Sequence, residues 1–307
     1  MSNIVVSPHN LSTMAGIEIL RQGGNAIDAA IATNIVQGVV APETCGIGGD
    51  LFALIWINGE TKPFCLDSSG YAGSNVDISS LSSYSHIPLD HPMSVTVPGA
   101  VRGWYAMHER FGSLEINHLF RQAIEICTKG FKVSTELHQS LKNHEETLKI
   151  QDSGKELYPS GQAPDVGDTI QRTLLANTLE SISLEGPDYF YTGEVNEAIS
   201  EALLNTITKD DISRFNSQWI EPLSIEMYGK IGWVTPPHTQ SYLTLATLKI
   251  YEMLDGDSKD IDLHTLIESY RAAASQRDDI TYDYGNNIDL FPGLNAEYLK
   301  SLSLIHI

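Results

Sequence analysis

The sequence predicts a layered α/β fold, and three observations carry that prediction. Short, strongly apolar runs with the length of buried strands stand between longer segments whose apolar residues recur at helical spacing. The hydrophobic fraction of 42% is ordinary for a globular protein, so 307 residues can form a sizeable core. No internal repeat and no low-complexity linker interrupts the pattern. Strands mixed with this many helices favour stacked layers over a helical bundle.

The N-terminal part predicts one strand followed by two buried helices. Residues 4–6 are expected to form the first strand. A helix follows, which Ser12 is expected to cap and Gly23-Gly24 to end, because glycine tolerates the left-handed conformation of a helix C-terminus. Asn25 is expected to cap the second helix. The apolar face of that helix consists of Ile27, Ala30, Ile31 and Ile35.

A hairpin and a long loop are expected next. Residues 51–57 are apolar and form a short run, which predicts a buried strand. Asn58-Gly59 is a hairpin turn signal, and residues 62–67 are expected to return alongside the first strand. Residues 68–90 are polar and rich in serine, which predicts a loop.

The remainder of the chain predicts mostly helices. A strand is expected at residues 95–97, and two strand segments are expected on either side of Gly229. Helices are expected at residues 100–110, 116–129, 135–149, 174–185, 196–204, 208–215, 242–254 and 263–276.

Charge and cysteine content exclude several functional classes. There are 19 Lys and Arg against 39 Asp and Glu, which gives a net charge of −20. A surface this acidic repels nucleic acid and anionic lipid, so neither is an expected partner.

The three cysteines fit no zinc spacing, and an odd number cannot form a closed disulfide framework. No apolar run reaches the ~18 residues of a membrane span, and the N-terminus has no signal-peptide pattern. These features predict a cytoplasmic protein with reduced thiols.

Searches for cofactor and metal motifs exclude the common ones. The glycine loop, defined here as Gly46 to Gly49, begins like a dinucleotide fingerprint, but Leu51 occupies the position of its last glycine. His86 and His91 are expected to be solvated, and Asp278-Asp279 to mark a helix end rather than a metal site. We therefore expect no cofactor and no metal. Gly46, Gly48 and Gly49 remain candidates, because backbone without side chains can approach a ligand closely.

A series of short segments then carries a resemblance to a known family. The segments are Ser7-Pro8-His9, Gly23-Gly24-Asn25-Ala26-Ile27-Asp28, Gly46-Ile47-Gly48-Gly49-Asp50-Leu51-Phe52, Val97-Pro98-Gly99-Ala100-Val101, Gly130-Phe131-Lys132-Val133-Ser134, Gly167-Asp168-Thr169, Glu185-Gly186-Pro187-Asp188 and Thr235-Pro236-Pro237. Each is weak alone, but together and in this order they resemble the large-subunit part of the γ-glutamyltransferase family. The resemblance runs from the N-terminus to about Leu299, which predicts one large-subunit portion over residues 1–299.

The resemblance implies a fold, an activity and a partner. The family has the four-layer αββα sandwich of the N-terminal nucleophile hydrolases. Its proenzyme cleaves itself and exposes a threonine at the start of a small subunit. That threonine attacks an amide carbonyl, and its own α-amino group takes the proton. Backbone N–H groups stabilise the oxyanion, and no cofactor is needed. The implied partners are a small amide substrate and the small subunit of the same precursor.

The chain departs from the family pattern at the nucleophile. The family threonine lies in a Thr-His segment, and this sequence contains no Thr-His dipeptide. We therefore expect no catalytic residue within this chain and no activity from it alone, whether it is a mature large subunit or the product of a truncated gene. Residues 300–307 do not resemble the family linker, which predicts a non-family tail. That tail resembles a translated sequencing adapter, with an ordinary variable terminus as the alternative.

A second departure concerns substrate recognition. True γ-glutamyl enzymes carry an arginine in a Leu-Asp-Phe-Arg segment, whose guanidinium fork binds the substrate carboxylate. Here Ser68 and Ser69 follow Leu66-Asp67, so a serine occupies the arginine position. Ser68 and Ser69 are candidate substrate-binding residues, with an ordinary turn as the alternative. Arg102 and Arg172 are further cationic side chains that the sequence does not place.

The altered segment resembles the branch that includes oxamate amidohydrolase, which implies small acidic amides as substrates. Two alternatives remain open: a non-catalytic binding protein that kept the large-subunit fold, and a true γ-glutamyl enzyme whose substrate carboxylate is bound by another residue.

Because the two subunits of the family share one sandwich, the large subunit alone is expected to expose apolar surface and to self-associate.

Overall fold

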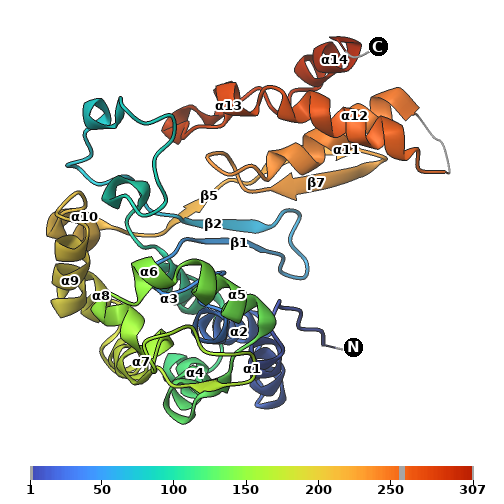
Figure 1. Ribbon diagram of the computed structural model, residues 1–307. Coiled ribbons are helices and arrows are strands. Elements are labelled where there is room, and N and C mark those ends of the chain that lie inside the picture. Colours follow the sequence, from blue (N-terminus) through green and yellow to red (C-terminus); the bar gives the residue numbers. More distant parts are fainter. Residues whose placement is uncertain (1–2, 256–259, 306–307) are drawn as a thin grey trace. The chain divides into compact units, whose positions relative to one another are not determined.

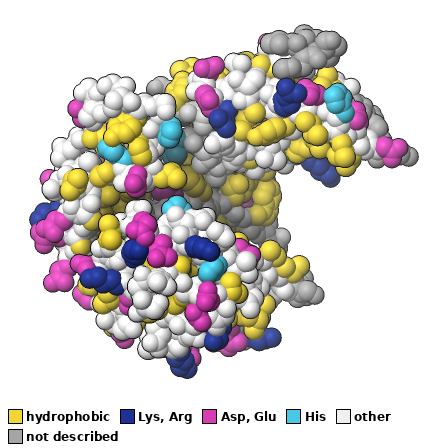
Figure 2. All heavy atoms as spheres, viewed as in Figure 1, with side chains coloured by type: hydrophobic (Ala, Val, Ile, Leu, Met, Phe, Trp, Pro, Cys, Tyr) yellow, Lys and Arg dark blue, Asp and Glu magenta, His cyan; other side chains and the backbone are white. Residues whose placement is uncertain are grey.

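The computed structural model describes residues 3–255 and 260–305, which form two compact units. The helical unit consists of the chain up to Leu51 together with residues 68–217, and the sheet unit consists of residues 52–67 and 218 onward. Each unit is therefore built from two separate stretches of sequence. Figure 1 shows the elements of both. On the face shown in Figure 2, acidic and basic side chains are interspersed.

Helices pack on one another in the helical unit. α2 contacts α1, α3 and α4, and α4 also contacts α7. β3 (Phe131–Lys132) and β4 (Thr169–Ile170) form a short antiparallel ribbon. The helices are α1 (Asn10–Arg21), α2 (Ala26–Val40), α3 (Ala100–Phe111), α4 (Ile116–Lys129), α5 (Thr135–Asn143), α6 (Glu145–Leu148), α7 (Thr173–Glu185), α8 (Asp188–Thr192), α9 (Glu194–Ala202) and α10 (Lys209–Arg214), with 3₁₀ turns η1 (Ile78–Leu81), η2 (Pro92–Ser94) and η3 (Asp152–Leu157).

The central helix, α2, begins where the sequence predicts. The side-chain oxygen of Asn25 accepts hydrogen bonds from the backbone N–H groups of Ile27 (2.8 Å) and Asp28 (3.0 Å). The Asp28 carboxylate accepts in return from the Asn25 N–H (2.9 Å). This reciprocal capping box satisfies N–H groups that a helix N-terminus leaves without partners. The carboxylate of Asp28 also accepts from Ser113 N–H (3.1 Å), so the cap links α2 to the segment after α3.

Strands and helices pack together in the sheet unit, although the first residue of β1 and the last residue of β2 belong to the helical unit. β1 (Leu51–Ile55), β2 (Phe64–Ser68) and β5 (Gln218–Ile220) form a sheet in the order β1-β2-β5, and Cys65 lies opposite Ile220 in an antiparallel pair. β6 (Leu223–Met227) and β7 (Lys230–Val234) form an antiparallel hairpin that α11 covers. The remaining elements are α11 (Tyr242–Asp255), α12 (Leu263–Ala274), α13 (Arg277–Ile280), η4 (Gly285–Leu290) and α14 (Ala296–Ile305).

The mixed α/β class is confirmed, together with most of the predicted helices and the hairpin around Gly229. Gly229 has a positive φ of 64°, the left-handed conformation that the hairpin turn needs. Asp278 and Asp279 lie in the first turn of α13, as the helix-end interpretation predicts. Turn glycines and helix-capping residues, which act over a few residues, therefore predicted these element boundaries correctly.

Four local predictions are wrong. Residues 4–6 form no strand, because a strand needs a hydrogen-bonded neighbour and no described residue pairs with them. Residues 95–97 contribute only one isolated bridge, between Thr96 and Ala72. The N-cap of α1 is His9, whose ring nitrogen accepts from the Leu11 N–H (3.1 Å); Ser12 instead lies buried inside the helix. The helix expected over residues 135–149 is divided in two at His144.

Candidate functional site

The glycine loop is fixed to the N-terminus of α3. The carbonyl oxygen of Gly49 accepts hydrogen bonds from Gly99 N–H (3.0 Å) and Ala100 N–H (2.9 Å). The Gly49 N–H in turn donates to the Gly46 carbonyl (3.0 Å), which closes a tight turn. Two residues at the start of α3 therefore hold the end of the loop, while its first part is free to form a wall of a cavity.

Ser68, the last residue of β2, also contacts Gly99 at the start of α3. Its hydroxyl donates to the Gly99 carbonyl (2.7 Å) and shares a second hydrogen bond with the Ser217 hydroxyl (2.7 Å). The backbones approach so closely that a Cβ on Gly99 would lie 1.8 Å from the Ser68 carbonyl oxygen. The structure thus brings Ser68 and Gly49 to opposite sides of one residue, Gly99.

Both predicted substrate-binding serines are buried in the helical unit. Ser68 is 0% exposed and Ser69 is 5% exposed. The Thr96 hydroxyl is placed 3.4 Å from both the Ser69 carbonyl and the Asp50 carboxylate, so Ser69 and the residue after the glycine loop share one neighbour. The geometry places these residues together, and a direct substrate contact at Ser69 stays a prediction.

The two unplaced arginines have different surroundings. The Arg102 guanidinium makes an ion pair with Asp188 (2.8 Å) and lies 4.6 Å from the centre of the Tyr191 ring. These contacts join α3 to α8, and the Asp188 carboxylate balances the charge of Arg102. Arg172, just before α7, has no ion pair within the described part of the chain; its Nη1 donates to the carbonyls of Gly38 (3.1 Å) and Val39 (3.3 Å) near the end of α2.

Arg172 and the glycine loop line one cavity of about 200 Å³. The sequence alone does not place this arginine, because its partners on α2 are 134 and 133 residues away. Burial lowers the pKa of the guanidinium, although an arginine remains charged under all ordinary conditions. The residues lining the cavity are Ile35, Gly38, Val39, Pro42, Cys45, Gly46, Ile47, Gly48, Trp104, Arg172, Leu175 and Leu179.

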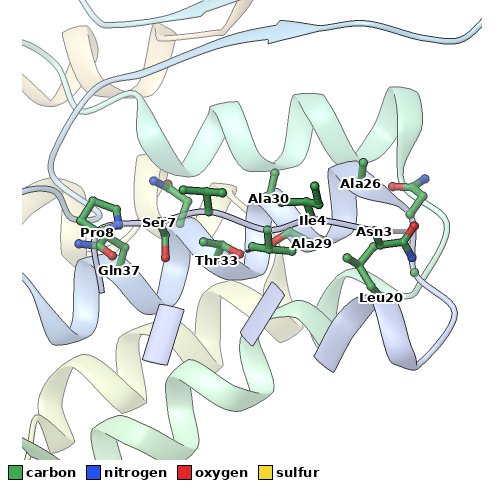
Figure 3. A pocket seen from close by; sticks show the side chains of 15 residues that line it. Asn3, Ile4, Ser7, Pro8, Leu20, Ala26, Ala29, Ala30, Thr33 and Gln37 are labelled. Carbon is green, nitrogen blue, oxygen red and sulfur yellow. Dashed lines mark hydrogen bonds between the residues drawn. The ribbon is translucent and has the colours of Figure 1, made fainter. Parts of the chain in front are cut away.

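A cavity of about 590 Å³ lies elsewhere in the helical unit and contains none of the predicted site residues. Figure 3 shows Ile4, Ser7 and Pro8 along the N-terminal segment beside Ala29 and Thr33 of α2. The lining has no ionisable side chain, so it offers no acid, base or charged anchor. Its geometry is that of a groove between the N-terminal segment and the helices.

Ionisable groups near the glycine loop are few. Burial raises the pKa of the Cys45 thiol, so this cysteine is a poor nucleophile at neutral pH. Among the residues described, no group of three or more His, Cys, Asp or Glu side chains could hold a metal ion. None of the helices in the described ranges has the length and apolar character that crossing a membrane requires. The groups near the glycine loop that can bind a ligand are therefore backbone amides, serine hydroxyls and the guanidinium of Arg172.

Comparison with known proteins gives consistent matches along nearly the whole chain. The Gamma-glutamyltranspeptidase family description matches residues 12–305. The chain is 32% identical over 311 residues to the glutathione hydrolase-like YwrD proenzyme of Bacillus subtilis, covering 98% of this chain and 59% of that protein. It is 31% identical to the oxamate amidohydrolase proenzyme of Klebsiella pneumoniae, with the same two coverages. The chain therefore spans about three fifths of the length of these relatives.

Solved structures agree with the sequence matches. The γ-glutamyltranspeptidase of Pseudomonas nitroreducens superposes with a TM-score of 0.88 at 26% identity, covering 99% of this chain and 94% of that chain. The Helicobacter pylori γ-glutamyltranspeptidase gives a TM-score of 0.89 at 25% identity, covering 100% and 92%. These likenesses confirm the predicted fold class, that of the N-terminal nucleophile hydrolases. The ordered segments, the fold and the family match together establish that the chain belongs to the γ-glutamyltranspeptidase family.

Proposed function

We propose that this chain is the large-subunit portion of an autoprocessing amide hydrolase or acyltransferase that acts on small acidic amides. The observation that carries the proposal is the family match over residues 12–305, in which the relatives named above are proenzymes. The nucleophile is a threonine at the start of a small subunit made from the same precursor. In this division of labour the large subunit contributes the binding surface and the small subunit the reacting groups.

The segment at Ser69 supports a substrate other than a γ-glutamyl amide. A buried serine stands where a γ-glutamyl enzyme would present a guanidinium, and a hydroxyl cannot form the bidentate, charge-assisted pair with a carboxylate. Losing such a pair costs roughly 2–5 kcal/mol of binding, enough to change substrate preference. One relative is named for oxamate, a small acidic amide. We infer a preference for amides of that size and charge.

Exposed apolar side chains support a small-subunit partner. In the helical unit, Ile4 is 82% exposed and Val6 is 86% exposed, and neither belongs to a paired strand. In the sheet unit, Trp56 follows β1 with 56% exposure and Ile231 of β7 has 59%. Apolar side chains left in water favour association with a further protein surface. The remaining two fifths of the relatives' length would supply such a partner.

The proposal is tested on the longer precursor. The gene would be sequenced past codon 299, and the whole reading frame expressed with and without alanine at the first threonine of a Thr-His segment. We expect cleavage into two subunits and hydrolysis of oxamate at a higher kcat/KM than a γ-glutamyl anilide. The alanine variant is expected to stay uncleaved and inactive.

Other results would overturn parts of the proposal. A reading frame without any Thr-His segment would contradict the enzyme assignment and favour the binding-protein alternative. Tight binding of a γ-glutamyl analogue by the cleaved enzyme would contradict the altered specificity at Ser69, and would favour a γ-glutamyl enzyme that holds the carboxylate with another residue.

A further inference from the structure

The cavity between the glycine loop and α7 contains a positive charge without a negative partner. Both hydrogen bonds described for the Arg172 side chain come from Nη1, and both go to neutral carbonyl groups on α2. Its Nε–H is buried and donates to no protein acceptor. Because Nε is enclosed by protein atoms, an anion that enters the cavity would reach Arg172 through its Nη groups, and no described residue supplies such an anion.

Neighbouring carboxylates do not fill this role. Burial lowers the pKa of the Arg172 guanidinium, and Cys127 and then Glu156 oppose that effect. Glu156 forms no ion pair with Arg172, and its carboxylate accepts from the Leu174 N–H (2.7 Å) at the start of α7. Arg102 is an instructive comparison, because its Nε is also buried without an acceptor, yet Asp188 and the Tyr191 ring balance its charge. A buried cation without such balance costs free energy until an anion reaches it.

The glycine loop adds unused donors to the same cavity. Gly46, Ile47 and Gly48 line it, and their backbone N–H groups donate no hydrogen bond in the described part of the chain. A Cβ added to Gly46 or Gly48 would meet nothing within 4 Å, so this stretch is open to an incoming group. Successive free amides are a common means of binding anionic oxygens.

The rest of the lining sets the size and character of a ligand. Ile35, Trp104 and Leu179 form an apolar wall. The volume of about 200 Å³ exceeds the roughly 150 Å³ of an engineered cavity that holds benzene. A compact anion with an apolar body satisfies both the wall and the guanidinium.

We propose that this cavity binds a small monocarboxylate, with the carboxylate on the Nη groups of Arg172 and the apolar body against Trp104 and Leu179. The site does not depend on the proposed catalytic function, because it involves only residues of the helical unit and no nucleophile. It is also separate from Ser69, which does not line the cavity.

The test uses ligand-observed fluorine NMR on the 307-residue chain, a method that tolerates self-association. The probe is para-fluorobenzoate, with para-fluorobenzamide as the neutral match. We expect saturable binding of the benzoate, and binding at least about tenfold weaker for the benzamide and for Arg172→Gln, the size of a lost charge-assisted hydrogen bond. Arg172→Lys keeps the charge but loses the planar guanidinium, so it is expected to weaken binding as well.

Two further variants separate binding from folding. Arg121→Gln removes an exposed arginine of α4 and is expected to leave the affinity unchanged. Gly48→Val places methyl groups at the cavity without touching Arg172, and is expected to weaken the benzoate although the fold is retained. If Arg172→Gln fails to fold, Gly48→Val and the benzamide comparison decide the question.

Three results would overturn the proposal: absence of saturable benzoate binding, equal binding of the benzamide, or unchanged affinity in folded Arg172→Gln. Each would mean that the guanidinium of Arg172 serves only to donate hydrogen bonds to the carbonyl groups at the end of α2. Because no turnover is measured, these outcomes are independent of whether the precursor hydrolyses amides.

Discussion

Gly49 and Gly99 are joined by a hydrogen bond of 3.0 Å from the Gly99 N–H to the Gly49 carbonyl, across 50 residues of sequence. The contact sets the end of the glycine loop against the start of α3, and Ser68 packs on the other side of Gly99. Space for a side chain is therefore absent at Gly99 but present at Gly48, and this difference can be measured.

Gly99→Ala is expected to destabilise the helical unit by about 2 kcal/mol or more, because its Cβ would lie 1.8 Å from the Ser68 carbonyl oxygen and backbone would have to move. The matched control, Gly48→Ala, adds a Cβ with nothing within 4 Å and is expected to stay within about 0.5 kcal/mol of the parent. Pulse proteolysis in urea at low protein concentration measures both. Equal stabilities would contradict the close approach at Gly99.

Asn25→Ala is expected to cost about 1–2 kcal/mol of stability, because it removes the cap of α2 and the hydrogen bond from its side-chain amide to the Phe111 carbonyl (2.6 Å). Asn117→Ala, at an exposed position of α4, is the control and is expected to have little effect. Thermal unfolding followed by circular dichroism compares the two. A control as damaging as the cap variant would show that the loss is not specific to capping.

Because of Asp211, the free energy of unfolding is expected to decrease as the pH falls. Burial alone would raise the pKa of its carboxyl, but hydrogen bonds from Ser74 and Thr208 hold that pKa well below the ordinary value of 3.8. A carboxyl with a lowered folded-state pKa stabilises the fold above its unfolded-state pKa, and this contribution is lost as pH falls toward the folded-state value. The decline is therefore expected to begin at about pH 5 and continue downward.

Asp211→Asn removes this contribution, so we expect a loss of about 2–3 kcal/mol at neutral pH and a flatter dependence below about pH 5. The neighbouring exposed carboxylate gives the control, Asp210→Asn, which is expected to keep the parental profile. Free energies of unfolding measured from pH 7 down to pH 3 would decide. A parental acid slope in Asp211→Asn would assign the pH dependence to other groups.

The three thiols are expected to react in an order set by burial. Cys65 and Cys127 are 2% and 0% exposed, and burial raises the pKa of each to about 12. Cys45 is half-buried, and its pKa is also raised by burial. Alkylation of the native protein is expected to modify Cys45 first, with a rate that increases as pH rises and thiolate forms. Peptide mass spectrometry locates the label; early labelling of Cys127 would contradict its burial.

Local signals in the sequence were sufficient for the family, the class of fold and many boundaries. Asn25 with Asp28, the turn at Gly229 and the helical spacing of α4 act over a few residues, so the chain's own pattern determines them. The same signals misled at residues 4–6, where strand-forming side chains are present but a pairing strand is not.

The candidate residues follow from the sequence alone: they are the glycine loop, the paired serines and two arginines without an assigned place. Two relationships required the folded structure. Ser68 contacts Ser217 across 149 residues, and Arg172 rather than Arg102 lines the cavity beside the glycine loop without a balancing charge. The physical reason is that spacing and composition specify local backbone conformation and burial. Contacts between distant residues depend on how helices and strands pack, and that packing is a property of the whole fold.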